Sequence, residues 1–404
     1  MRLYHVQQRL HTRPLADVAA AVVDELERLQ LVVPQGEVAI TVGSRGIRNL
    51  PTIIRTCGDW LKSRGARPFI VPAMGSHNGA TAAGQQQMVE SLGLTEAAMG
   101  MPIRSSMEVV KLGDVATGSV YMDRHCYQSD GVLVVNRIKL HTCFSGPVQS
   151  GLTKMMVVGM GKIRSAETFH SAPTPVMKDM LLEMGECVLA SGKVLAGVAI
   201  LEDGNDDTAE MHAIAPEDIL RREPDLLNRH REYFPTLPVS KLNVLVVDSI
   251  GKTFSGTGMD TNVIGRRGVR GFEDVERPEV GIIAALELAA ASKGNAIGVG
   301  LADFISQSLR DAIDESKTLI NVLTTGEMSR AKIPATLADH QAVVRTIGER
   351  FGWERWMFIP NTLCLDSLYV TPDLADELKD HPRCEVAADP IELTFADGRH
   401  QLPF

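Results

Sequence analysis

The chain has 404 residues, more than one hydrophobic core usually supports, so we expect two domains. Apolar residues make up 44% and charged residues 23% of the sequence, which is typical of a globular protein and excludes a largely disordered one. The net charge is −9 and the basic residues are scattered, which argues against binding to nucleic acid or to an anionic membrane and favours a small-molecule ligand. The sequence shows no signal peptide and no apolar run of the roughly 18 residues that span a bilayer, so we expect a cytoplasmic protein.

The first half alternates helical and strand-like patterns. Apolar residues recur at spacings of three and four over 15–31, which predicts a helix, and a second helix is predicted over 50–62. Strands are predicted for VAITV from Val38, for PFIVP, for GVLVVNRI and for KVLAGVAILEDG, and the stretch ATAAGQQQMVESLG is compatible with a helix. This alternation predicts an α/β layer, in which ligands collect at the carboxyl ends of the strands; Ser44, Arg45, Ser76 and His77 would lie there.

Two prolines in EYFPTLPVSK precede a new strand-like run, LNVLVVDSIG, and predict a domain boundary near Pro238. The fold class is therefore expected to be two α/β domains, a cofactor-binding and catalytic domain over 1–238 and a second over 239–404, with the active site in the cleft between them. In the second domain the strand candidates include NAIGVG, TLINVLTT and WMFIPNT, and helices are predicted near 283–291, 302–312 and 339–350.

The segment from Asn136 to His170 carries the strongest chemical signal. It follows the GVLVV run and places His141, Lys154 and His170 within a short stretch, which supplies an acid/base, a point of covalent attachment and a metal ligand. On one continuous helix, Lys154 and His170 would stand about 24 Å apart. Gly159 and Gly161 interrupt the segment, and because glycine lets a chain reverse, the two side chains can converge on one cofactor.

Other cofactor motifs are absent from the sequence. GMGKIR lacks the third glycine and the preceding strand of a dinucleotide-binding loop, and neither a GxxxxGK[ST] loop nor an HExxH helix occurs. The six cysteines show no CxxC pairing, so they are interpreted as reduced, mostly buried thiols.

As a set, these residues resemble the nickel-dependent lactate racemase family, whose members carry a nickel-pincer nucleotide. Lys154 matches the lysine that bears this cofactor, and His170 matches the histidine that also holds nickel. His77 and His141 match the two catalytic histidines, and Arg45 matches a substrate-site arginine. Ser44, beside Arg45, is assigned to cofactor binding on the same resemblance.

Three departures separate this chain from the lactate racemases. His141 precedes Lys154 by 13 residues, about three more than the family's spacing, and Val42 stands where an aspartate is usual. In GMDTNVIGRRGVRG, Gly265 and Gly268 replace an expected glutamine and lysine, so we expect a substrate other than lactate.

The resemblance implies racemisation or epimerisation of a 2-hydroxy acid by reversible hydride transfer through a 2-keto acid. Hydride transfer avoids removing the very weakly acidic Cα proton, and inversion requires acid/base groups on both sides, which His77 and His141 would supply. Arg45 would hold the substrate carboxylate. Arg266 and Arg267, with Arg270, would grip a longer or second anionic group such as the end of a sugar acid, and Trp353 would wall the site.

Two alternatives stay open at this point. One is a metal-dependent hydro-lyase or a cofactor-free epimerase that moves protons between His77 and His141. The other is a non-catalytic protein that binds a nickel, nucleotide or sugar-acid ligand. The expected partners are a hydroxy-acid substrate and the proteins that make the cofactor, while the oligomeric state is left open.

Overall fold

The computed structural model describes residues 1–404 apart from residue 272 and the side chains of residues 324 and 325. Residue contacts divide the chain into two compact units. We call His11–Phe234 the N-terminal unit, and Met1–Leu10 together with Pro235–Phe404 the C-terminal unit. Among the described residues, no helix is both long and apolar enough to cross a membrane.

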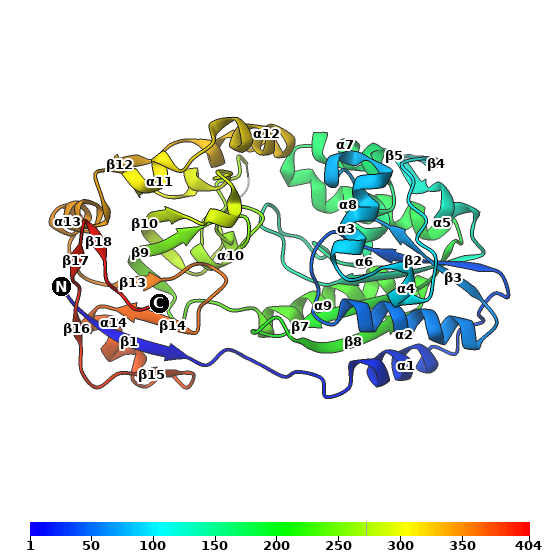
Figure 1. Ribbon diagram of the computed structural model, residues 1–404, viewed down its shortest axis with the longest axis horizontal. Coiled ribbons are helices and arrows are strands. Elements are labelled where there is room, and N and C mark those ends of the chain that lie inside the picture. Colours follow the sequence, from blue (N-terminus) through cyan, green and yellow to red (C-terminus); the bar gives the residue numbers. More distant parts are fainter. Residues whose placement is uncertain (272) are drawn as a thin grey trace. The chain divides into compact units, whose positions relative to one another are not determined.

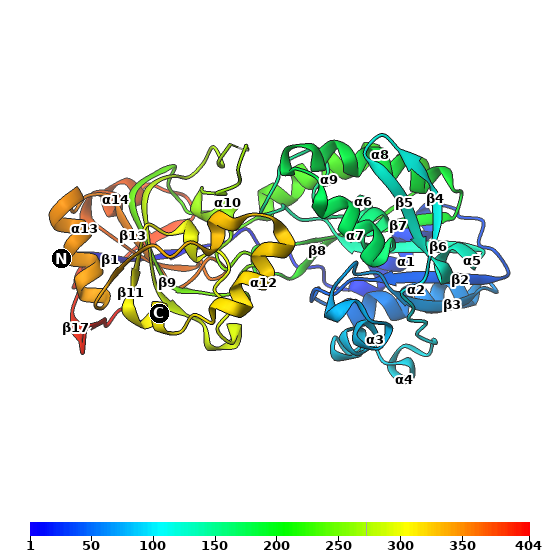
Figure 2. The same ribbon diagram turned by 90° about the horizontal axis from the view of Figure 1, so that it is seen from above.

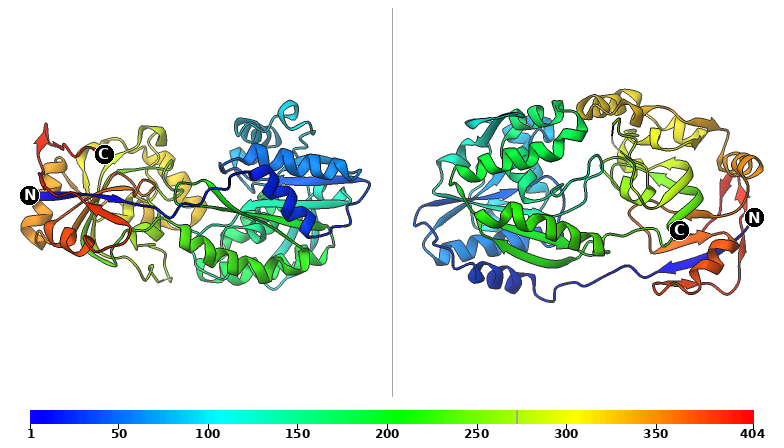
Figure 3. Two further views of the ribbon diagram at one scale, coloured as in Figure 1. Left: turned by 90° about the horizontal axis from the view of Figure 1, so that it is seen from below. Right: turned by 180° about the vertical axis from the view of Figure 1, so that it is seen from behind.

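The sequence assigned residues 1–10 to the N-terminal domain, and the structure places them in the other unit. Strand β1 (Arg2–Gln8) pairs antiparallel with β14 (Ser367–Val370) and β15 (Cys384–Val386), as the right-hand view of Figure 3 shows. These partners follow β1 by more than 350 residues. Nothing in the local pattern of β1 could reveal such a pairing, because strand periodicity shows which face is buried and not which strand lies alongside.

The N-terminal unit is built on a sheet with the strand order β3-β2-β6-β7-β8. All neighbours are parallel except β7 and β8. The strands are β2 (Glu37–Val42), β3 (Arg67–Pro72), β6 (Gly131–Arg137), β7 (Val194–Glu202) and β8 (Thr208–Ile214); β4 (Val109–Val115) and β5 (Gly118–Asp123) form a separate antiparallel ribbon. Val38, Ala39 and Ile40 of β2 are fully buried, since helices cover both faces of a parallel sheet.

Helices pack on both sides of this sheet. In Figure 1, α1 and α2 lie on one side and α7 and α8 on the other. The shorter α6 contacts both α8 and α9, and Figure 2 shows these helices grouped together. The helices are α1 (Val18–Arg28), α2 (Leu50–Ser63), α3 (Ala82–Ser91), α4 (Glu96–Met99), α5 (Arg124–Gln128), α6 (Leu152–Lys154), the π-helical η2 (Met155–Gly159), α7 (Lys162–Ser171), α8 (Met177–Ala190) and α9 (Ile219–Tyr233).

The C-terminal unit has its own sheet, with the order β12-β11-β10-β9-β13-β14-β1-β15 and with β16 paired to β1. From β12 to β13 the strands run parallel, and β14 reverses the direction. The remaining strands are β9 (Lys241–Ile250), β10 (Glu279–Leu288), β11 (Phe304–Ser306), β12 (Ala335–Leu337), β13 (Trp356–Ile359), β16 (Ile391–Glu392), β17 (Phe395–Ala396) and β18 (Arg399–His400). The helices include α10 (Thr261–Ile264), α11 (Gln307–Asp311), α12 (Glu315–Thr325), α13 (His340–Phe351) and α14 (Pro372–Leu378).

The predicted α/β class is confirmed, and three element predictions in the C-terminal unit are wrong. The helix predicted near 283–291 is largely β10, whose apolar run does not alternate because Ile283–Leu286 are buried inside a parallel sheet. TLINVLTT, predicted as a strand, lies in α12, which Asp314 caps at its start and Gly326 ends with a positive φ of 76°. NAIGVG, also predicted as a strand, leads into a short 3-10 turn at Val299–Leu301.

Candidate functional site

The predicted site residues of the N-terminal unit follow the carboxyl ends of three neighbouring strands. Ser44 and Arg45 follow β2, His77 follows β3, and His141 follows β6. The chain leaves β2 through α2 to reach β3 on one side, whereas β6 lies on the other side of β2. The strand order therefore reverses between β2 and β6, which is where ligands bind in open α/β sheets.

Ser44 and His77 contact each other across this edge of the sheet. The Ser44 hydroxyl is hydrogen-bonded to Nδ1 of His77. His77 is exposed. The turn after it runs through three residues with positive φ, Asn78, Gly79 and Ala80, and this turn sets where the imidazole stands.

His141 and Lys154 form a second contact. Nε2 of His141 lies 2.7 Å from Nζ of Lys154. The loop fixes His141, because its backbone N–H donates to Gln149 at 2.7 Å and its Nδ1 accepts from the Cys143 N–H at 3.1 Å. A neutral imidazole that accepts at Nδ1 carries its proton on Nε2, so it can donate that proton to a neutral Lys154 amine.

Electrostatics make the neutral amine of Lys154 more accessible near neutral pH, although the ammonium form still predominates at pH 7. The pKa of Lys154 is lowered to about 8. Burial is the main cause, the charge of Arg45 acts in the same direction, and Cys143 opposes the shift. Burial likewise lowers the pKa of His170 to about 4, with the charges of Lys154 and His77 adding to the effect. At pH 7 His170 is therefore a neutral imidazole, the form that binds a metal ion.

The charges of Lys154 and His77 both lower the pKa of His170, which places these two side chains in its neighbourhood. The helical run between Lys154 and His170 is bent, since η2 interrupts it and a turn at Met160 and Gly161 follows. The sequence attributed a reversal to Gly159 and Gly161, and this is wrong in detail. The residue with positive φ is Lys162, at 54°.

Gly159 and Gly161 serve close packing instead. A Cβ on Gly159 would stand 2.7 Å from the backbone oxygen of Ala73, and one on Gly161 would stand 2.6 Å from the backbone oxygen of Val157. The backbone oxygen of Gly159 also accepts from the Gly75 N–H at 3.2 Å. Gly159 thus lets the η2 turn press against the loop that carries His77, and Gly161 lets the start of α7 lie close against η2.

Lys162 is a supporting residue that the sequence did not single out. It is fully buried, pairs with the equally buried Asp123 at 3.2 Å, and donates to the Pro72 backbone oxygen and to Gln85. Burial lowers its pKa, and Asp123 opposes that shift. The hydrogen bond from Lys162 to Pro72 joins the start of α7, which carries His170, to the end of β3. No sequence pattern marks the ion pair of Lys162, because Asp123 is 39 positions distant.

Glu223 is a second buried charged residue behind the site, and it holds Thr153, the residue before Lys154. It is 1% exposed on α9, and its Oε2 accepts from the backbone N–H of Thr153 at 2.8 Å and from the Thr153 hydroxyl at 2.7 Å. Burial raises the pKa of Glu223 to about 7, against the effect of these hydrogen bonds. The carboxyl group thereby caps α6, the short helix that ends in Lys154.

Arg45 stands among cations. The residue is exposed overall, but the neighbouring protein removes solvent from its guanidinium and so lowers its pKa. The charge of Arg137 lowers this pKa further. Arg137 is itself paired with the buried Glu202. Arg45 is therefore a cation that can offer its guanidinium to an anionic ligand at this end of the sheet.

The other predicted substrate residues belong to the C-terminal unit. Arg266 pairs with Asp303 at 2.8 Å and donates to the Leu301 backbone oxygen at 3.0 Å, and Arg267 is 7% exposed. Trp353 precedes β13, stacks on Trp356 with ring centroids 5.6 Å apart, and fills the space beside Gly348. The roles of these three residues in substrate binding stay predictions.

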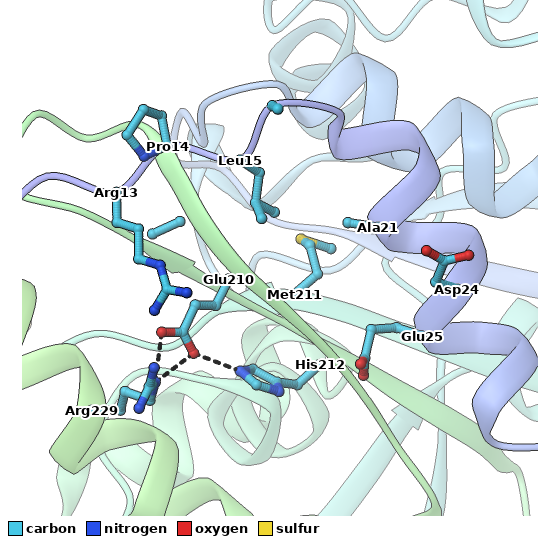
Figure 4. A pocket seen from close by; sticks show the side chains of 12 residues that line it. Arg13, Pro14, Leu15, Ala21, Asp24, Glu25, Glu210, Met211, His212 and Arg229 are labelled. Carbon is cyan, nitrogen blue, oxygen red and sulfur yellow. Dashed lines mark hydrogen bonds and ion pairs between the residues drawn. The ribbon is translucent and has the colours of Figure 1, made fainter.

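The pocket drawn in Figure 4 lies elsewhere in the N-terminal unit, between the start of α1 and β8, and contains none of the predicted site residues. Its polar groups satisfy one another, since Glu210 binds Arg229 at 2.6 Å and His212 at 3.0 Å. The lining residues are Arg13, Pro14, Leu15, Ala16, Ala21, Asp24, Glu25, Ala209, Glu210, Met211, His212 and Arg229.

Comparison with solved structures supports the resemblance at the level of the fold. The lactate racemase apoprotein from Thermoanaerobacterium thermosaccharolyticum matches with a TM-score of 0.54, over 88% of this chain and 94% of that chain, at 13% identity. The two chains share a fold. No protein-family model and no curated protein sequence matches this chain. The roles assigned to individual residues therefore stay predictions.

Proposed function

We propose that this protein is an isomerase that racemises or epimerises a 2-hydroxy acid with a nickel-pincer nucleotide attached to Lys154. One observation carries the proposal: a lysine whose pKa is lowered to about 8 contacts one histidine and shares its surroundings with a neutral one, at the ligand-binding edge of a sheet. The fold shared with a lactate racemase apoprotein supports it.

The residues present fit this cofactor. Lys154 offers a nucleophilic amine near neutral pH, as covalent attachment requires. His170 is held neutral, and imidazole nitrogen is a good nickel ligand. Ser44, beside the first strand end, would contact the nucleotide. When bound, the pyridinium ring of such a cofactor accepts a hydride from Cα and returns it.

The chain's own groups handle protons and charge. His77 and His141 follow different strands, and each would take the hydroxyl proton of one stereoisomer and return it to the other. Arg45 would bind the substrate carboxylate and fix Cα in position. The short contact between His141 and Lys154 would be replaced once the lysine amine becomes an amide, and this frees Nε2 of His141 for the substrate.

We propose a substrate longer than lactate. In this proposal the C-terminal unit closes over the substrate, and Arg266 and Arg267 hold a second anionic group. That group would have to compete with Asp303 for Arg266. Gly265 is left-handed, with φ 71°, and its Cβ would collide with the Pro278 backbone oxygen, so the glutamine expected there from the lactate racemases does not fit this backbone.

The proposal is tested first by mass. The full chain is co-expressed with a pincer-cofactor biosynthesis system, and the masses of the denatured protein and of its peptides are measured by mass spectrometry. We expect an adduct on Lys154 that a Lys154→Arg variant lacks. An unmodified lysine in a host that loads a known racemase would contradict the proposal.

Isotope retention is the second test. With 2-deuterated hydroxy acids, hydride transfer keeps deuterium at Cα, whereas proton transfer between His77 and His141 exchanges it with solvent. Retention in both stereoisomers is expected. Free washout would favour the proton-transfer epimerase, and tight binding without any turnover would favour a non-catalytic binding protein.

A further inference from the structure

A second group of chemistry-bearing side chains lies in the C-terminal unit, near the carboxyl ends of β9 and β10. Asp248, His340 and His400 each offer one ligand-type atom, and these atoms all lie within 4.8 Å of one another. Glu287 stands behind them and contacts His340. The four come from β9, β10, the start of α13 and β18, so the fold brings together distant parts of the chain.

His340 is held in a metal-binding form. Its Nε2 lies 2.9 Å from Oε1 of Glu287, and the same Glu287 oxygen also accepts from the Ser308 hydroxyl at 2.8 Å. In the tautomer that donates from Nε2 to this carboxylate oxygen, the lone pair of His340 is on Nδ1. His340 is 3% exposed and its Nδ1 has no hydrogen-bond partner.

An unsatisfied buried nitrogen costs free energy unless something binds it. A carboxylate that orients a histidine through one ring nitrogen and leaves the other for a cation is the usual second shell of a metal site. The ring centroids of His340 and His400 lie 5.3 Å apart, which brings a second imidazole to the same point.

His400 and Asp248 complete the set. Nε2 of His400 lies 2.6 Å from Oδ1 of Asp248, and Nδ1 of His400 accepts from the Leu402 N–H at 3.2 Å. Ligation through Nε2 needs the other tautomer, with the proton on Nδ1. The Leu402 hydrogen bond would then be lost, a change confined to the irregular segment after β18.

From this geometry we infer that Asp248, His340 and His400 bind a divalent transition-metal ion, with Glu287 positioning His340. Two imidazoles and one carboxylate are a ligand set that suits zinc and its late first-row neighbours, whereas magnesium and calcium prefer oxygen. Arg399 lies 3.1 Å from Glu287. This ion pair balances the negative charge of Glu287, which is not itself a proposed ligand. The inference stands independently of the proposed isomerase, whose proposed catalytic and cofactor-binding residues lie in the other unit.

The test uses zinc alone and the full chain. Metal content after equilibrium dialysis is measured for wild type, His340→Gln and His400→Gln, with His381→Gln as a matched histidine control in the same unit. We expect each cluster variant to lose one zinc per chain and the control to lose none. Because a second zinc could bind His170 and its neighbours, a His170→Ala chain must keep the zinc of this cluster.

Two further measurements keep the inference falsifiable if a variant fails to fold. Anomalous diffraction at the zinc edge from wild-type crystals should show a peak about 2.0–2.2 Å from its three ligands. Glu287→Gln should weaken zinc binding about 10–100-fold without removing a ligand. A map with no peak at the cluster, or equal zinc loss in His381→Gln, would overturn the inference and leave a hydrogen-bonded histidine network.

Discussion

Both units place histidines at the carboxyl ends of a parallel sheet, but the partners of these histidines carry opposite charge. In the N-terminal unit His141 contacts Lys154, and neighbouring charges lower the pKa of His170 to about 4. In the C-terminal unit His340 and His400 each contact a carboxylate. Cationic surroundings keep imidazoles neutral and ready for acid/base work or an added group, while carboxylates fix a tautomer for a cation.

The largest effect expected from this comparison concerns turnover. Under the proposed function His77→Ala and His141→Ala each remove an acid/base, so the racemisation rate should fall about 10²–10⁴-fold. His381→Gln in the C-terminal unit is the control and should leave the rate unchanged. Rates are measured in both directions with cofactor-loaded protein, and an intact rate in either alanine variant would refute the assignment of that histidine.

The next largest effect concerns the ion pair behind the N-terminal site, which is fully buried, whereas the pair of Glu287 and Arg399 behind the second cluster is partly exposed. Lys162→Met leaves Asp123 charged and buried, so the free energy of unfolding should fall by about 3–5 kcal/mol. The double variant Lys162→Met with Asp123→Leu removes both charges and should recover much of this loss. Denaturant unfolding checks both variants, and equal losses in the two would show that packing matters rather than the unpaired charge.

The sequence predicted the strand ends and most N-terminal elements, because apolar runs and the loops after them are local features. Its assignment of the N-terminal site residues, through a resemblance carried by Lys154, His170 and the residues before them, stays a prediction. The sequence could not predict Lys162 with Asp123, or Glu223 with Thr153, since these contacts join residues 39 and 70 positions apart. The cluster of Asp248, His340 and His400 was missed for the same reason.

A third prediction concerns the reactivity of Lys154. At pH 7 a pKa of about 8, rather than 10.5, gives about 300 times more neutral amine. Acetylation followed by peptide mass spectrometry across pH should therefore show a midpoint near pH 8 for Lys154. Lys379 serves as the control, because its hydrogen bond to Asp376 raises its pKa. Comparing midpoints rather than rates removes the effect of access, and a Lys154 midpoint near that of Lys379 would contradict the proposed nucleophile.

The smallest expected effect is on how stability depends on pH. It should differ in sign between Glu223, whose pKa is raised, and Glu287, whose pKa is lowered. Burial raises the pKa of Glu223 to about 7, so its folded state binds a proton more tightly than its unfolded state. The resulting stabilisation is complete below pH 4.5 and is lost as the pH rises through 7. Glu287, whose pKa is lowered, instead stabilises the fold at higher pH and loses that contribution on acidification.

Unfolding of wild type and Glu223→Gln at pH 5 and pH 8 tests this sign. Wild type should lose on the order of 2–3 kcal/mol more than the variant between these values, because the glutamine does not ionise. Glu217→Gln, an exposed change close to the start of α9, is the matched control and should follow wild type. If Glu223→Gln shows the same pH dependence as wild type, Glu223 is ionised in the folded protein across this range. Its hydrogen bonds to Thr153 would then outweigh burial, and Lys154 would lie near a buried negative charge that favours the ammonium over the nucleophilic amine.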